Sequence, residues 1–171
     1  MHIAFMSSRD IQVRHSAYGS REMDFEDNVD VGIEVGDVVK RGGTGGNYAV
    51  HIQDGDPEAG TDITLGVIKV APNNTATADG KGTVELVGPG SVISGKATTP
   101  ANINTAAKLL AIKLDFVTFD RSADTAAGVL TIDEDEGDDP NVHGLMILDG
   151  DIEKGTLEVM TAAGLIFGST V

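Results

Sequence analysis

The chain has 171 residues, of which 40 % are hydrophobic, so it is long enough to build one domain with a real core. Its net charge of −15 argues against a surface that neutralises nucleic-acid phosphates, and the absence of cysteine excludes disulfides and thiolate zinc sites. Residues 1–10 lack the cationic and apolar regions of a secretory signal, and no stretch reaches the ~18 apolar residues of a membrane-spanning helix. We therefore expect a protein made in the cytoplasm that binds neither nucleic acid nor membranes.

Residues 1–28 are predicted to form an extended, irregular N-terminal arm. Residues 1–21 carry three arginines against one aspartate, a local charge of +2, which leaves −17 on the remaining residues. The apolar side chains of the arm come singly or in small groups, and neither the helix period nor the strand period is sustained. Such an arm is long enough to reach a neighbouring subunit. The alternative is a first strand with a frayed terminus, in which Ile11 and Val13 form a short strand.

A dense pattern of β-strands is predicted from Val29 onward. Residues 29–35 alternate strictly between apolar and other side chains, as a half-buried strand does. The glycine cluster 42–46 separates two further runs and predicts a hairpin or a mobile loop, because the Lys-Ser/Thr pair of a phosphate-binding loop is missing. Residues 63–70 form a nearly continuous apolar run, with Gly66 as a predicted bulge. The remaining predicted strands are residues 83–87, 91–97, 114–120, 128–133, 142–149, 156–160 and 165–167.

One amphipathic helix is predicted near residues 100–113. Thr99 can cap it, and Pro100 suits its first position. Its apolar face is predicted to consist of Ile103, Ala106, Ala107, Leu110 and Leu114. The sum is a mainly β domain of about ten short strands with one helix.

A calcium loop at residues 54–65 is excluded by the residues at two decisive positions. Carboxylates occupy several ligand positions of the twelve-residue frame, at Asp54, Asp56, Glu58 and Asp62. However, Ala59 stands where the sharp turn requires glycine, and Leu65 stands where a bidentate glutamate is required. The stretch is therefore predicted to be an acidic connection between strands.

The strongest local charge feature is the run from Asp133 to Asp139, with six carboxylates in seven residues. We expect a solvated loop between strands; the alternative is a calcium or magnesium site, with Asp139 and His143 meeting across a turn. The chain contains no Gly-x-Ser-x-Gly elbow and no recognisable Ser/His/Asp cluster. We therefore predict no enzymatic activity and no cofactor.

The order of features in residues 48–97 resembles a known family. A short strand ends in Asp-Gly (YAVHIQDG) and is followed by a small polar turn (DPEAGTD), a strand carrying Leu-Gly-Val-Ile, a polar link (APNNTATADGKG), a Thr-rich strand (TVELV) and a Gly-Pro-Gly-Ser turn. This order is similar to the head decoration proteins of lambdoid phages, whose small domain is called a β-tulip. The resemblance covers roughly a third of the chain. It implies a compact β-barrel or β-sandwich-like domain over residues 29–171, with a tulip-like part at about 29–97, an added helix and strands at 98–171, and an extended arm at 1–28.

The resemblance also implies a function. Such proteins bind the outside of a mature capsid, clamp neighbouring capsomers and are commonly trimers. The expected partner is the major capsid protein, the expected location is the outer surface of the virion, and the arm is expected to order on the capsid. The candidate capsid-contacting residues are Ile3, Phe5, Arg9, Ile11, Val13, Arg14, Tyr18 and Arg21.

Two alternatives remain at this point. One is another virion component, such as a tail-tube protein or a fibre domain, because these also have β-rich folds. The other is a divalent-metal-binding module that uses Asp133–Asp139 and His143.

Overall fold

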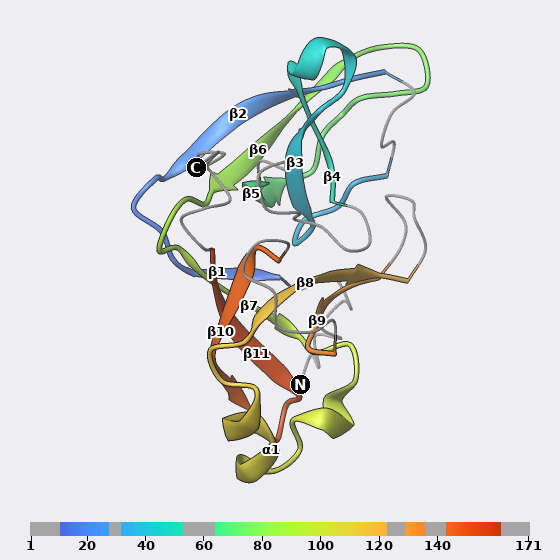
Figure 1. The fold of residues 1–171 in the computed structure, drawn as a ribbon. Helices are drawn as coiled ribbons and strands as arrows, with labels where there is room; N and C mark the ends of the chain where they lie inside the picture. Colours follow the sequence, from blue (N-terminus) through green and yellow to red (C-terminus); the bar gives the residue numbers. More distant parts are fainter. Residues whose placement is uncertain (1–10, 28–31, 53–63, 123–128, 136–142, 162–171) are drawn as a thin grey trace, which may run out of the picture.

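Two antiparallel β-sheets, one above the other in Figure 1, make up most of the molecule. The computed structural model describes residues 11–27, 32–52, 64–122, 129–135 and 143–161. Within these residues it contains eleven strands, one α-helix and two short 3-10 helices. The predicted mainly β, sandwich-like class is confirmed, and neither sheet is closed into a barrel.

Each sheet is built from strands that lie far apart in the sequence. Sheet A has the order β1 (Gln12–His15), β7 (Val92–Lys96), β11 (Thr156–Thr161), β10 (Leu145–Asp151), β8 (Phe116–Arg121) and β9 (Leu130–Asp133). Sheet B has the order β2 (Ser20–Phe25), β6 (Gly80–Leu86), β5 (Thr64–Val70), β3 (Val38–Gly42) and β4 (Tyr48–His51). The predicted hairpin around the glycine cluster is confirmed, with the 3-10 helix η1 (Thr44–Gly46) between β3 and β4. The predicted strands between residues 83 and 160 correspond to β6 to β11, and 165–167 lies outside the described residues.

The predicted strand at 29–35 is wrong for its described part. Residues 32–37 form turns, and Gly32 and Gly36 have φ values of 107° and 92°, in the left-handed region. The side chain of Asp37 accepts a hydrogen bond from the amide of Glu34 (3.0 Å), which closes a turn over these residues. An alternating sequence therefore does not form a strand here, because this local hydrogen bond competes with sheet pairing.

The described part of the predicted arm is not irregular. Residues 12–15 and 20–25 are β1 and β2, which pair antiparallel with β7 and β6; the β2–β6 ladder is continuous, and the β1–β7 ladder has one register shift between Val13 and His15. Ile11 and Phe25, at either end of this segment, are 3 % and 0 % exposed. The sequence pattern is weak because both strands lie at the edge of a sheet and expose most of their side chains. Residues 1–10 lie outside the described residues.

The predicted helix is shorter than expected, and a different set of its side chains is buried. The structure has a 3-10 helix η2 (Pro100–Asn102), a break, and then α1 (Ala106–Ala111), whose N-cap is the extended residue Thr105. The buried apolar side chains are Ile103 and Leu109, whereas Leu110 is 72 % exposed. The apolar face predicted from the 3–4 spacing is wrong, because the break between η2 and α1 changes which side chains of α1 point toward the core.

The hydrophobic core has two parts. The larger cluster joins side chains of sheet A, such as Ile93 and Phe119, to Val38 and Val67 of sheet B, so it holds the two sheets together. The smaller cluster includes Phe25 and lies on the other face of sheet B, which curls until its edge strands β2 and β4 approach each other. None of the helices in the described residues is long and apolar enough to cross a membrane.

A buried ion pair connects the sheets inside this core. Arg121 ends β8 of sheet A, and Asp37 precedes β3 of sheet B; both side chains are fully buried, and Arg121 Nη2 lies 3.5 Å from Asp37 Oδ1. Arg121 Nε also donates to the carbonyl of Ile52 (2.7 Å), next to β4. The guanidinium therefore contacts two separate segments of sheet B.

Gly66 sits at a bulge, as the sequence predicts. Val39 pairs with Gly66 and Lys40 pairs with Thr64, so β5 carries one extra residue against β3. A Cβ atom on Gly66 would lie 2.0 Å from the carbonyl oxygen of Glu85 in β6. Only glycine allows this close approach of the two backbones.

Replacing Arg121 by methionine should strongly destabilise the protein. The apolar stem is kept, but Asp37 becomes a buried charge without its cation, which costs about 3–5 kcal/mol. We expect urea denaturation to show that loss in the free energy of unfolding. The double variant Asp37→Asn/Arg121→Met should lose less, because no charge remains buried. If Arg121→Met were as stable as the wild type, the ion pair would not be needed for the stability of the fold.

Gly66→Ala should destabilise the protein by about 3 kcal/mol, because a methyl group cannot enter without moving the backbone of β6. Gly90→Ala is the matched control, since Gly90 has a φ of 80° but open space around it. The control should lose only about 1 kcal/mol, the cost of a left-handed backbone for alanine. Equal losses in thermal or urea unfolding would contradict the steric explanation.

Candidate interaction surfaces

The N-terminal segment of the described chain runs along the edge of both sheets. β1 is the first strand of sheet A, and β2 is the first strand of sheet B. No other strand in the described residues pairs with the outer edge of either one, but β4 approaches the edge of β2 where sheet B curls, so β1 has the more open edge. Open strand edges present unpaired N–H and C=O groups, which are a template for pairing with another chain. We call residues 12–25 the edge segment.

The structure separates the predicted capsid-contacting residues into three groups. Ile3, Phe5 and Arg9 lie outside the described residues. Ile11 is buried, and Val13 is half-buried against the larger core cluster, so both side chains pack on the core; that they contact a partner stays a prediction. Their side chains alternate toward the core because β1 is a strand of the sheet.

Arg14, Tyr18 and Arg21 are exposed on the edge segment. The Tyr18 ring lies against the turn at Gly88, where a Cβ atom would be 2.3 Å from the ring, and its hydroxyl donates to the carbonyl of Pro89 (3.5 Å). Arg21 contacts the carbonyl of Ser20 (3.1 Å), and no ion pair of Arg21 is found within the described residues. The edge segment therefore exposes two cations, an aromatic ring and two carboxylates, Glu22 and Asp24, which both pair with Lys81.

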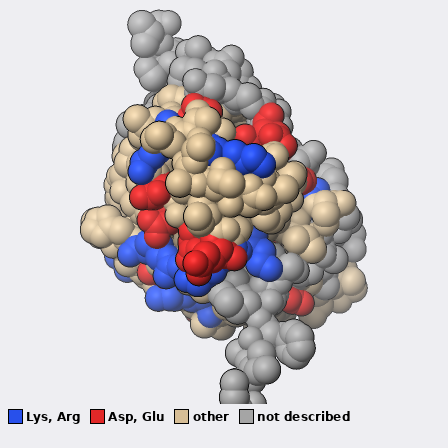
Figure 2. Space-filling view, turned by 90° about the horizontal axis from the view of Figure 1, so that it is seen from below, with Lys and Arg blue, Asp and Glu red and all other residues tan. Residues whose placement is uncertain are grey.

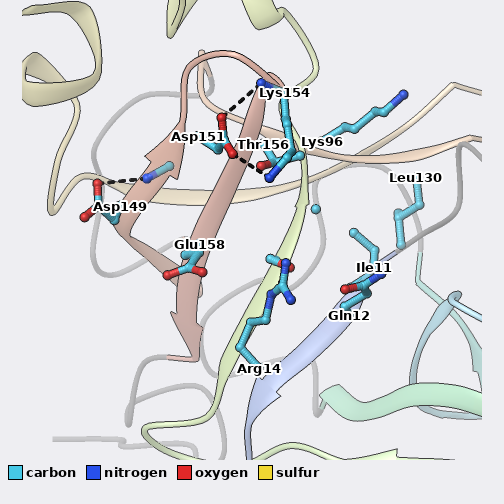
Figure 3. Close-up of a pocket in the computed structure, with 13 residues that line it drawn as sticks. Ile11, Gln12, Arg14, Lys96, Leu130, Asp149, Asp151, Lys154, Thr156 and Glu158 are labelled. Carbon is cyan, nitrogen blue, oxygen red and sulfur yellow. Dashed lines mark hydrogen bonds and ion pairs between the residues drawn. The ribbon is translucent and has the colours of Figure 1, made fainter. Parts of the chain in front are cut away.

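A second surface is a concave pocket of about 610 Å³ that lies mainly on the outer face of sheet A and is also lined by the core residues Ile11 and Leu130. Figure 3 shows Asp149, Asp151 and Lys154 on one side and Ile11, Gln12 and Arg14 on the other. The strands β1, β7, β11 and β10 carry it, and in their register Ser94 pairs with both Gln12 and Glu158. The intervening side chains, such as Ile93 and Leu157, point to the core.

The charged side chains of the pocket are partly paired. Lys154 Nζ lies 2.8 Å from Asp151 Oδ2, and this contact holds the pKa of Asp151 below its ordinary value. The pKa of Asp149 is also lowered, first by the amide of Gly150 and then by Lys113, which lies 3.3 Å away. Seen from the lower end of the molecule, basic side chains gather in a group beside acidic ones (Figure 2).

The acidic run does not begin as a solvated loop. Glu134 is 7 % exposed, and its Oε1 accepts hydrogen bonds from the amide of Thr99 (3.0 Å) and from Asn102 Nδ2 (3.1 Å). Its Oε2 is buried and has no hydrogen-bond partner among the described residues. Burial raises the pKa of Glu134, although the hydrogen bonds act in the opposite direction. The prediction of a solvated stretch is therefore wrong for Glu134, because it anchors the η2 segment.

The predicted metal-binding residues are not brought together in the described part of the chain. Residues 136–142, including Asp139, and the acidic stretch 53–63 lie outside the described residues. His143 is 7 % exposed. Among the residues that the structure describes, no group of three or more His, Cys, Asp or Glu side chains could hold a metal ion.

Sequence reasoning missed the pocket. The sequence signal for this pocket is an alternation of polar and apolar side chains: Ser94 and Lys96 alternate with apolar neighbours in β7, as do Thr156 and Glu158 in β11. This alternation identifies a polar face on each strand. It does not reveal that β7 pairs with β11, which only the sheet order decides.

No protein-family model, curated protein or solved structure matches this chain.

The raised pKa of Glu134 predicts a specific pH dependence of stability. The folded protein holds this proton more tightly than the unfolded chain, so the contribution of Glu134 is most favourable below the ordinary carboxyl pKa. It falls as the pH rises from that value through the raised folded-state pKa. Glu134→Gln stays neutral and keeps an acceptor for Thr99, so it should melt at a higher temperature than the wild type at neutral pH. The difference should vanish in acid.

The control for this prediction is Glu22→Gln, the same change of side chain at an exposed carboxylate on β2 of the other sheet. It should show no gain that depends on pH. A melting-temperature difference between Glu134→Gln and wild type that stays constant from acid to neutral pH would contradict the assignment.

Proposed function

We propose that the protein is a capsid decoration protein, which binds the exterior of a phage capsid and stabilises it by clamping neighbouring capsomers. The observation that carries the proposal is the edge segment, residues 12–25, which leaves the outer edge of β1 without a paired strand among the described residues and exposes Tyr18 and Arg21. The resemblance of residues 48–97 to head decoration proteins supports the same function.

The edge segment suits binding by strand addition. A strand of the major capsid protein that pairs with β1 would satisfy the open backbone groups of that edge, and main-chain hydrogen bonds would supply affinity. Tyr18 supplies a rigid amphipathic contact, a residue type enriched at interface centres. One segment serves both sheets, so a partner bound along it would contact both of them.

The charge distribution supports one orientation on the shell. Arg21 favours contact of the edge segment with an acidic partner surface, because the two carboxylates of this segment, Glu22 and Asp24, are already paired with Lys81. Complementary charge steers association and fixes register. The acidic remainder of the chain would then face solvent, where like charge keeps particles from adhering to each other. Assembly as a homotrimer would add avidity, because each further contact on the same shell becomes intramolecular.

The proposal predicts that the protein sediments with mature shells of its phage and raises their resistance to heat. Tyr18→Ser/Arg21→Glu should weaken binding at least tenfold, that is by about 1.4 kcal/mol or more, because it removes an aromatic anchor and reverses a charge. Lys108→Glu, on the exposed surface of α1, is the matched charge-reversal control and should bind as the wild type does.

Three results would contradict the proposal: no sedimentation of the wild type with shells, equal binding of the edge variant, or self-assembly into tubes by electron microscopy, which would favour a tail-tube protein. Sedimentation equilibrium of the free protein tests the trimer separately. A single-chain mass at the highest soluble concentration would exclude it.

A further inference from the structure

The pocket on the outer face of sheet A has the size and construction of a small-molecule site. Its volume of about 610 Å³ lies within the usual range for ligand pockets. Gln12 and Arg14 of β1 form one wall, and residues of the β10–β11 hairpin, including Lys154, form another (Figure 3). Ser94 lies between them on β7 and is 5 % exposed.

Arg14 is aimed into this space by two features of the backbone. The register of β1 against β7 shifts between Val13 and His15, so Arg14 is the extra residue of a bulge, a device that redirects a side chain. Its Nε then donates to Ser94 Oγ (2.8 Å). This bond holds the plane of the guanidinium and leaves both Nη groups without a partner among the described residues.

The charges of the pocket do not cancel one another in pairs. Six charged side chains line it; Asp151 pairs with Lys154, and Asp149 pairs with Lys113 outside the pocket. The remaining three, which have no ion-pair partner among the described residues, are Arg14, Lys96 and Glu158. Two cations and one carboxylate are therefore left to meet a ligand.

Arg14 and Lys154 also act on each other. The pKa of Lys154 is raised, chiefly by its hydrogen bond to Asp151, while the charge of Arg14 acts in the opposite direction. The two cations are thus near enough to repel, and an anionic group between them would relieve this repulsion. Arginine holds phosphate and carboxylate groups through two parallel N–H donors, which the free Nη groups can provide.

We infer that this pocket binds a compact zwitterionic ligand, with a phosphate or carboxylate group held by Arg14 and an ammonium group held by Glu158. The inference does not rest on the proposed function, because it concerns the outer face of sheet A rather than the open edge, although Gln12 and Arg14 belong to both the pocket and the edge segment. The two sources of the anionic group, a phosphate and a carboxylate, are distinguished by the experiment.

The test uses three probes titrated into the full chain by calorimetry at low salt: O-phosphoethanolamine, β-alanine and inorganic phosphate. We expect millimolar binding of one zwitterion, tighter than that of phosphate, because phosphate lacks the ammonium group. Preference for O-phosphoethanolamine identifies a phosphate ligand, and preference for β-alanine identifies a carboxylate ligand. Raising the salt to about 0.3 M should weaken binding, because the contacts are screened.

The variants separate the two contacts. Arg14→Gln should weaken the zwitterion about tenfold, as expected for a lost charge-assisted pair. Glu158→Gln should reduce the affinity of the zwitterion to that of inorganic phosphate, the probe without an ammonium group. Lys96→Gln provides a second cation variant in case Arg14→Gln folds poorly. Lys81→Gln is the control, because Lys81 lies on β6 and is paired with Glu22 and Asp24.

The inference is overturned if no probe binds at about 20 mM in low salt, or if Arg14→Gln and Lys96→Gln both bind as the Lys81→Gln control does. These results leave the capsid experiment unaffected, because the edge variant changes Tyr18 and Arg21 and no residue of the pocket.

Discussion

The ion pair between Arg121 and Asp37 constrains the way in which the two sheets meet. Two charges removed from water are stable only when they face each other and their remaining polar atoms find partners. Here Arg121 also donates to Ile52, and Asp37 accepts from Glu34, so one guanidinium is tied to the turn before β3 and to the residue after β4. Sliding or rotating one sheet on the other would separate the charges, whereas apolar contacts alone tolerate such shifts.

The arrangement of the sheets determines what the surface offers. With the sheets held in one orientation, the chain passes from the edge of sheet A to the edge of sheet B within residues 12–25. The same pairing of β1 with β7 creates the bulge at Arg14 and turns its side chain onto the outer face, where the pocket lies. The edge segment and the pocket are therefore two consequences of one strand placement.

These two surfaces are suited to different partners. The edge segment is long, backbone-rich and open, which suits another polypeptide, whereas the pocket is concave and charged, which suits a compact ligand. Both use cations that are scarce in a chain with 12 basic and 27 acidic residues. A decoration protein that also held a small zwitterion would present one surface to the shell and another to solvent.

The sequence by itself determined the β class, the hairpin around the glycine cluster, the bulge at Gly66 and most strands between residues 83 and 160. These features depend on local periodicity and on glycine, which act within a few residues. Only the tertiary structure decided that residues 12–25 are strands, that Glu134 is buried and that Arg14, Ser94 and Glu158 share a face. The physical reason is that edge strands, buried carboxylates and cross-strand neighbours all depend on which distant segments pair. The contacts that stabilise them join residues as far apart in the sequence as Arg14 and Ser94.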